Sequence, residues 1–154
     1  MFDAVKSGEV QRTKAWFSCF KDICTADGDR NTPLIIAAQK GNVEMVRALL
    51  EGGANTERGN VRNTTALDMA ALSGYLEVCR LLLDWGANVD PLDSSNNTPL
   101  HHASGKGYFS VVKLLVERGA NVRLRNKKNQ TPSQVARSSG HKEIADWLDL
   151  ASRG

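Results

Sequence analysis

A period of 33 residues runs through the chain and limits its possible folds more than any other feature. One series of threonines recurs at this interval, at Thr32, Thr65, Thr98 and Thr131. A series of glycines keeps the same interval, at Gly8, Gly41, Gly74, Gly107 and Gly140. The tripeptide Gly-Ala-Asn also recurs, beginning at Gly53, Gly86 and Gly119. Three phased series in 154 residues indicate a repeated structure in which each unit stacks on the next.

Each unit is predicted to contain two helices and a hairpin. Thr98 is placed as a helix N-cap and Pro99 as the first helical residue, where a missing N–H costs nothing. The recurring glycine then ends this short helix in a left-handed conformation. A second helix, for example over 76–83, has apolar residues at helical spacing and so buries one face. The segment 87–97 that follows is rich in Asn, Asp and Ser, as turns are. We predict an all-α solenoid.

These units resemble the ankyrin-repeat family. The resemblance rests on Thr98-Pro99-Leu100-His101, on Ala37-Ala38, on Gly74-Tyr75-Leu76-Glu77-Val78 and on the run from Leu81 to Asp90. It extends over nearly the whole chain and implies one ankyrin-repeat domain over 1–154. Within it we expect full repeats at 27–59, 60–92 and 93–125, between capping repeats at 1–26 and 126–154.

The terminal units depart from the inner pattern as capping repeats do. Arg12 and Thr13 stand where the inner repeats have apolar residues, and Phe20 replaces the glycine that follows the second helix. At the other end, Ser133 replaces the leucine of the Thr-Pro-Leu motif, and Lys142 replaces an apolar residue at the start of the second helix. We therefore expect a complete solenoid.

Composition argues against several other classes of protein. The three cysteines, Cys19, Cys24 and Cys79, are odd in number and lack metal-ligand spacing. This favours reduced thiols in the cytoplasm or nucleus, with no metal and no cofactor. No apolar run approaches the roughly 20 residues of a membrane helix, so we expect no membrane insertion. The net charge of +3 permits an acidic partner without requiring nucleic acid. We expect a monomer.

His101 and His102 are the residues that most suggest catalysis or metal binding. The resemblance places His101 where an imidazole hydrogen-bonds between neighbouring repeats. His141 stands at the position of Tyr75 and Tyr108, directly after the recurring glycine, which implies a structural role. The sequence contains no nucleophile–base set, no glycine-rich phosphate loop and no serine elbow motif. We therefore predict no enzymatic activity and no small-molecule substrate.

Three glycosylation sequons begin at one repeat position, at Asn63, Asn96 and Asn129. Asparagine tolerates positive φ better than most residues, so a turn explains these residues without secretion. Arg30 holds the same position in the first full repeat, where positive φ costs more. The alternative is that the turn there shifts to Gly28.

The resemblance implies a concave binding surface made of hairpins and first helices. We expect the following residues to contact a partner on it: Asp29, Asn31, Gln39, Lys40, Val61, Arg62, Thr64, Leu72, Ser73, Leu92, Ser95, Asn97, Lys106, Arg123, Arg125, Lys127 and Lys128.

Two features of this surface favour a particular partner. Val61, Leu72 and Leu92 are apolar where other repeats are polar, which predicts a small hot spot. The segment 123–128 has four cations in six residues. A solvated loop that only aids solubility is the alternative interpretation of this segment. Trp85 is expected to pack under the neighbouring hairpin, because large rings usually bury most of their area. The alternative is that it is exposed as a second contact point.

We predict a non-enzymatic interaction module, an adaptor or scaffold that binds an acidic, partly apolar segment of another protein. One alternative is a stoichiometric inhibitor or assembly chaperone that docks on a folded enzyme such as a kinase. The size and all-repeat build are similar to ankyrin-type cyclin-dependent kinase inhibitors, although those have a degenerate second repeat and the repeats here are regular. A remote alternative is nucleic-acid binding through the basic hairpins, which lack the interleaved aromatic residues that stack on bases.

Overall fold

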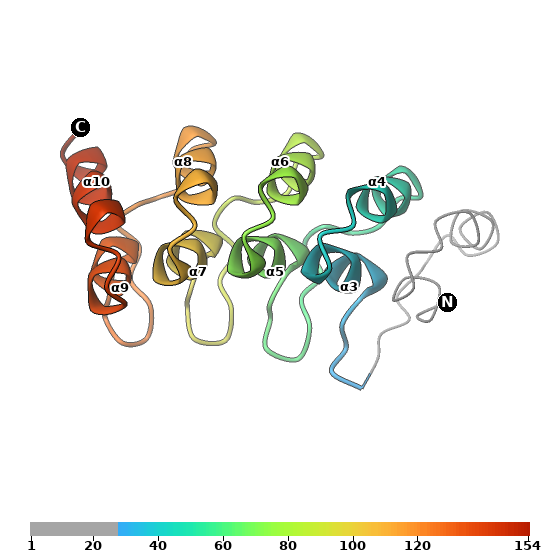
Figure 1. Ribbon diagram of the computed structural model, residues 1–154. Coiled ribbons are helices and arrows are strands. Elements are labelled where there is room, and N and C mark those ends of the chain that lie inside the picture. Colours follow the sequence, from blue (N-terminus) through green and yellow to red (C-terminus); the bar gives the residue numbers. More distant parts are fainter. Residues whose placement is uncertain (1–27) are drawn as a thin grey trace.

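The computed structural model describes residues 28–154, which form helix pairs that stand side by side (Figure 1). The pairs are α3 (Pro33–Gln39) with α4 (Val43–Glu51), α5 (Ala66–Ser73) with α6 (Leu76–Asp84), α7 (Pro99–Lys106) with α8 (Phe109–Glu117), and α9 (Pro132–Ser138) with α10 (Lys142–Arg153). Hairpin loops join each pair to the next. No strand occurs in this part of the chain, and the predicted all-α solenoid is confirmed. The predicted capping repeat at 1–26 lies outside the described residues.

Each first helix begins at a threonine of the 33-residue series, as predicted. The side-chain oxygens of Thr32, Thr65, Thr98 and Thr131 each accept a hydrogen bond from the backbone N–H three residues later. At the last three, the side chain of that third residue bonds back to the threonine N–H and completes a capping box. Because such a cap contributes about 1 kcal/mol, the series stabilises every first helix that the structure describes.

The glycine series supplies the turn between the two helices of a pair. Gly74, for example, has φ +79° in the left-handed region. A Cβ atom there would lie 2.8 Å from the ring of Tyr108, which belongs to the next repeat. The ring of His141 lies against Gly107 in the same way, and a Cβ atom on that glycine would lie 2.6 Å from it. The predicted structural role of His141 is therefore confirmed: it packs one repeat onto another.

The hairpin turns place Arg30, Asn63, Asn96 and Asn129 at φ between +58° and +61°. Positive φ at the asparagines is confirmed, whereas the alternative of a shift to Gly28 is wrong. The reason lies in the neighbouring hairpin, because the Asp29 carbonyl accepts a hydrogen bond from the Val61 N–H at 3.0 Å. This bond holds the first hairpin in the register of the others, so Arg30 takes the left-handed conformation itself.

The core lies between the row of first helices and the row of second helices (Figure 1). Leu67, Leu82, Leu100 and Leu115 are among its fully buried side chains. Each first helix contacts the next along the row α3, α5, α7, α9, and these contacts are more extensive than those along α4, α6, α8. Burial of each such leucine contributes about 1.5–3 kcal/mol, so neighbouring repeats stabilise one another.

Trp85 does not pack as expected. Its side chain is 47% exposed, although the sequence favoured burial under the next hairpin. Trp85 is the C-cap of α6 and so lies at the outer tip of its helix. The neighbouring repeat reaches this tip through a polar contact instead, since the Arg118 guanidinium donates to Asp84 Oδ1 at 2.7 Å.

We expect Gly74→Ala to destabilise the protein more than Gly86→Ala. Both glycines have positive φ, +79° and +85°, so alanine costs about 1–2 kcal/mol at either position. Only at Gly74 would the new methyl group also meet an aromatic ring, which adds about 1 kcal/mol or more. Urea unfolding of both variants measures the difference. Equal losses would contradict the packing of Tyr108 on this turn.

Candidate functional site

Two adjoining hollows lie between the hairpins and the first helices. The N-side hollow, of about 370 Å³, lies over α3 and α5, and the C-side hollow, of about 480 Å³, lies over α7 and α9. Leu72, Ser95 and His102 line both hollows. The two hollows therefore form one continuous depression, which we call the inner groove.

The structure brings most of the predicted contact residues to the inner groove. The N-side hollow is lined by Asp29, Asn31, Gln39, Val61, Arg62, Thr64, Leu72 and Ser95, and the C-side hollow by Leu72, Ser95, Asn97, Lys106, Lys127 and Lys128. Lys40, Ser73, Leu92, Arg123 and Arg125 line neither hollow.

The basic segment 123–128 is divided between two surroundings. The Arg123 guanidinium donates to the carbonyl of Ser152 at the end of α10. Arg125 donates to the carbonyl of Asn129 at 2.8 Å, within its own hairpin. Lys127 and Lys128 instead line the C-side hollow. The two arginines hold the last repeat together, and the two lysines face the inner groove.

Lys106, Lys127 and Lys128 are exposed and form no ion pair with any residue in 28–154. Arginines away from the groove do have acidic partners there. Arg118 pairs with Asp84 at 2.7 Å, and Arg137 with Asp149 at 2.7 Å. The C-side hollow thus gathers three positive charges that this part of the protein leaves uncompensated.

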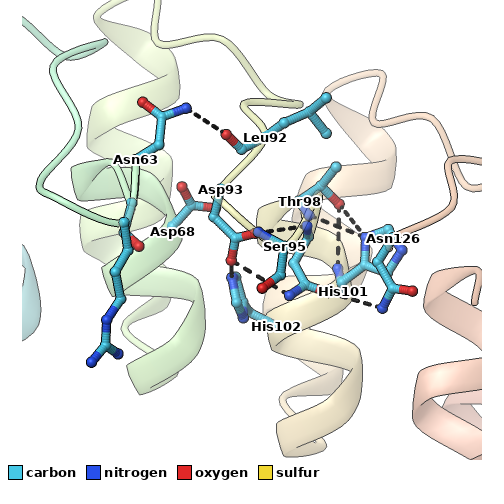
Figure 2. Close-up of polar contacts among 12 residues, drawn as sticks. Asn63, Asp68, Leu92, Asp93, Ser95, Thr98, His101, His102 and Asn126 are labelled. Atoms are coloured by element: carbon cyan, nitrogen blue, oxygen red, sulfur yellow. Dashed lines mark hydrogen bonds and ion pairs between the residues drawn. The ribbon is translucent and has the colours of Figure 1, made fainter. Parts of the chain in front are cut away.

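The hairpins are joined by pairs of side-chain amides, with one exception at the centre of the groove. Asn60 Nδ2 donates to Asn31 Oδ1 at 2.9 Å, and Asn126 Nδ2 donates to Asn97 Oδ1 at 3.0 Å. At the corresponding place between them, Asp93 replaces the donor asparagine. Its Oδ2 lies 3.0 Å from His102 Nε2 (Figure 2). The hydrogen bond between Asp93 and His102, which lies within one repeat, thus replaces the side-chain amide bond that joins two repeats at the other hairpins.

His102 is a groove residue that was not among the predicted contact residues. It occupies the same repeat position as Met69 and Val135, which also line the groove. This position lies four residues before Lys106, so both side chains share one face of α7. This four-residue spacing is the signal that would have identified Met69, His102 and Val135 from the sequence. A contact position at the end of a first helix implies a second one a helical turn earlier.

The Asp93 carboxylate can only accept, so His102 Nε2 carries the proton of their hydrogen bond. Burial lowers the pKa of His102, and the nearby charge of Lys106 lowers it further, whereas Asp93 opposes both effects. The net shift is downward. At neutral pH the groove therefore presents an uncharged imidazole between the two hollows.

His101 points between repeats, as the resemblance implied. Its Nδ1 accepts from the Thr98 N–H at 3.1 Å (Figure 2). Its Nε2 lies 3.0 Å from the carbonyl of Gln130 in the next hairpin. Burial lowers the pKa of His101, which keeps the ring neutral in this role.

Asp68 occupies the equivalent position one repeat earlier and is fully buried. Its Oδ2 accepts from the Thr65 N–H at 2.9 Å and from the Thr65 hydroxyl at 3.0 Å. Its Oδ1 has no hydrogen-bond partner among the described residues. Burial raises the pKa of Asp68 to about 7, because a charged carboxylate is poorly solvated there.

The buried thiol of Cys79 is also far from reactive. Burial raises its pKa to about 12, so the sulfur stays protonated at neutral pH. Within residues 28–154, no three His, Cys, Asp or Glu side chains are arranged to hold a metal ion. None of the helices there has the length and apolar character that crossing a bilayer requires.

Comparison with known proteins agrees with this architecture. The family model for ankyrin repeats (3 copies) matches residues 1–93 and residues 86–151. The chain belongs to the ankyrin-repeat family. A search of curated proteins gave no match. Ankyrin repeats generally mediate protein–protein interaction and are typically non-enzymatic modules. Among residues 28–154 of this ankyrin-repeat protein, the inner groove combines a hollowed shape with positive charges that form no ion pair.

We expect Asp68→Asn to remove a pH dependence of stability. The folded-state pKa of about 7 lies above the ordinary value of 3.8, so the folded state holds a proton that the unfolded state releases. The free energy of unfolding then falls as pH rises between these values, by up to about 1.4 kcal/mol per pH unit, and levels off above pH 7.

Urea unfolding of the unmodified protein and the variant at pH 5, 6, 7 and 8 tests this expectation. The free energy of unfolding of the variant, relative to that of the unmodified protein, should rise with pH up to pH 7, because the amide has no proton to lose. Parallel pH profiles of the two proteins would contradict a buried, protonated Asp68.

We also expect two substitutions to shift the pKa of His102 in opposite directions. Lys106→Gln removes a repelling charge and should raise it, whereas Asp93→Asn removes an attracting charge and should lower it. An NMR titration of the imidazole resonances measures both shifts. Movement in the same direction in the two variants would contradict the electrostatics described here.

Proposed function

We propose that the inner groove binds an acidic, partly apolar segment of a partner protein, so that this ankyrin-repeat protein acts as an adaptor or scaffold. The observation that carries the proposal is the grouping of Lys106, Lys127 and Lys128 in one hollow without acidic partners in residues 28–154. Three ammonium groups that share a depression repel one another. A bound acidic segment relieves that repulsion and gains charge-assisted hydrogen bonds.

Apolar residues in the groove supply the second part of the interaction. Val61, 56% exposed, and the half-buried Leu72 line the N-side hollow. Covering such side chains removes apolar area from water, at about 25 cal/mol per Å². Charge then speeds encounter with the partner, and burial of the apolar contacts prolongs the bound state.

Docking on a folded enzyme is a second candidate, favoured by exposed apolar residues outside the groove. Leu92 is 43% exposed and lies in the hairpin beside the groove, and Trp85 is exposed at the tip of α6. A folded partner that covered both would bury more surface than a peptide can. An inhibitor or assembly chaperone would use such a surface.

Nucleic-acid binding is the least favoured candidate, because Arg123 and Arg125 donate to carbonyl groups of the chain itself. We further propose that the protein acts as a monomer in the cytoplasm or nucleus, where Cys79 would stay reduced.

We expect the triple variant Lys106→Glu, Lys127→Glu, Lys128→Glu to lose affinity for an acidic peptide by about tenfold or more at 50 mM salt. The probe is a fluorescein-labelled 14-residue peptide with one leucine and three glutamates, followed by anisotropy. Raising the salt to 200 mM should weaken binding of the unmodified protein and narrow the difference, because the groove charges are then screened.

A matched control reverses three exposed cations outside the groove: Arg47→Glu, Lys142→Glu and Arg153→Glu. Both variants change the net charge by the same amount. Equal losses in the two variants, or no loss in either, would contradict a specific groove and support the solvated-loop interpretation.

A further inference from the structure

The two hollows of the inner groove differ in chemistry, and this difference determines which part of a bound segment lies in which hollow. We infer that the partner segment is extended and bipartite, with an apolar side chain in the N-side hollow and its acidic group three to six residues away in the C-side hollow. This inference rests on the proposed function and specifies the kind of partner that the groove accepts.

Charge places the acidic group. The C-side hollow is lined by Lys106, Lys127 and Lys128, which do not line the other hollow. No Asp or Glu is among the described residues that line it. Asp29 and Asp93 line only the N-side hollow, where Arg62 is the one charged group of opposite sign among the described residues. An acidic side chain is therefore attracted to the C-side hollow, whereas in the N-side hollow two carboxylates oppose the attraction of Arg62.

Asp93 strengthens this asymmetry because its own hydrogen bonds are already made. Its Oδ1 accepts from the N–H groups of Ser95 and Asn97, each at 2.8 Å, and its Oδ2 bonds to His102. These contacts fix the carboxylate beside the junction of the hollows. A second carboxylate at the junction would be repelled.

Apolar surface places the other end of the segment. Val61, Met69 and Leu72 all line the N-side hollow, whereas Val135 and the shared Leu72 are the aliphatic side chains of the C-side hollow. The repeat position that carries Met69 in the first hollow carries the polar His102 at the junction. An apolar anchor therefore buries most area over α5.

We take the bound segment to be extended, because an extended chain can place one side chain into each hollow, of about 370 and 480 Å³, while its backbone follows the groove.

Repeat geometry then determines the spacing. Packed helices lie about 8–10 Å apart, and an extended chain advances about 3.3 Å per residue, so one repeat corresponds to about three residues. Leu72 in α5 and Lys106 in α7 are one repeat apart (Figure 1). The hairpins that carry Val61 and Lys127 are two repeats apart, which gives the upper limit of about six residues.

Peptides of one composition and varied spacing test the inference. Labelled 14-residue peptides carry a single leucine and two adjacent glutamates, the nearer of which lies one, four or nine residues from the leucine. Each peptide is made with the leucine before the glutamates and with the leucine after them. The groove charges determine which hollow takes each group, but not whether the peptide runs from N- to C-terminus or the reverse along the groove. Anisotropy gives the dissociation constants.

We expect the four-residue spacing to bind about tenfold more tightly than the other two, in at least one direction. Equal affinity at all three spacings would overturn the inference. If reversal of the lysine charges still weakened binding in that case, the proposed function would stand. Tightest binding at nine residues would overturn the extended conformation. No binding by any peptide would contradict the proposed function as well.

Val61→Ser and Leu92→Ser form a matched pair that locates the anchor. Both residues are exposed aliphatic side chains of hairpins, but only Val61 lines the groove. Val61→Ser should weaken binding of the best peptide several-fold, and the effect should vanish when serine replaces the leucine of the peptide. Equal effects of the two protein variants would place the anchor outside the N-side hollow and overturn the inference.

Discussion

The backbone hydrogen bonds between successive hairpins are the interaction on which the remaining structure depends. The Asp29, Arg62 and Ser95 carbonyls accept from the N–H groups of Val61, Ser94 and Lys127, at 2.8–3.0 Å. These bonds fix how far each repeat is displaced from the last. The register forces Arg30 into the left-handed region, and it aligns residues of equal repeat position into rows. The inner groove is the surface that results from this alignment.

The proposed binding site includes positions where the repeat pattern is broken. The position that carries His101 shows the tolerance of the fold, because Asp68 and Gln134 also complete the capping box there. Asp93 replaces the donor asparagine and bonds to His102, which places a titratable imidazole at the centre of the groove without loss of the hairpin. The departures are local because each repeat contacts only its neighbours.

The fold could be predicted from the sequence almost completely, since the threonine caps and glycine turns act within a few residues of themselves. The groove could be predicted only in part. Arg125 and Lys127 are close together in a basic run, yet one bonds to its own hairpin and the other lines the groove. Which way each points depends on the path of the hairpin and on the contacts of α9 and α10, which no local pattern encodes. The prediction for Trp85 was wrong for the same reason. Its exposure depends on which part of the next repeat reaches the tip of α6, and no local pattern encodes that contact.

Stability and the proposed recognition depend on different residues of each repeat. The buried leucines, the threonine caps and the aromatic rings against the glycines recur with the period and hold the repeats together. Lys106, Lys127 and Lys128 are exposed and make no ion pair in the described part of the chain, so they add little to folding. Their mutual repulsion is tolerated because water solvates them in the free protein. The groove can therefore hold charge that the fold does not need, and a surface of that kind gains most from a partner of opposite charge.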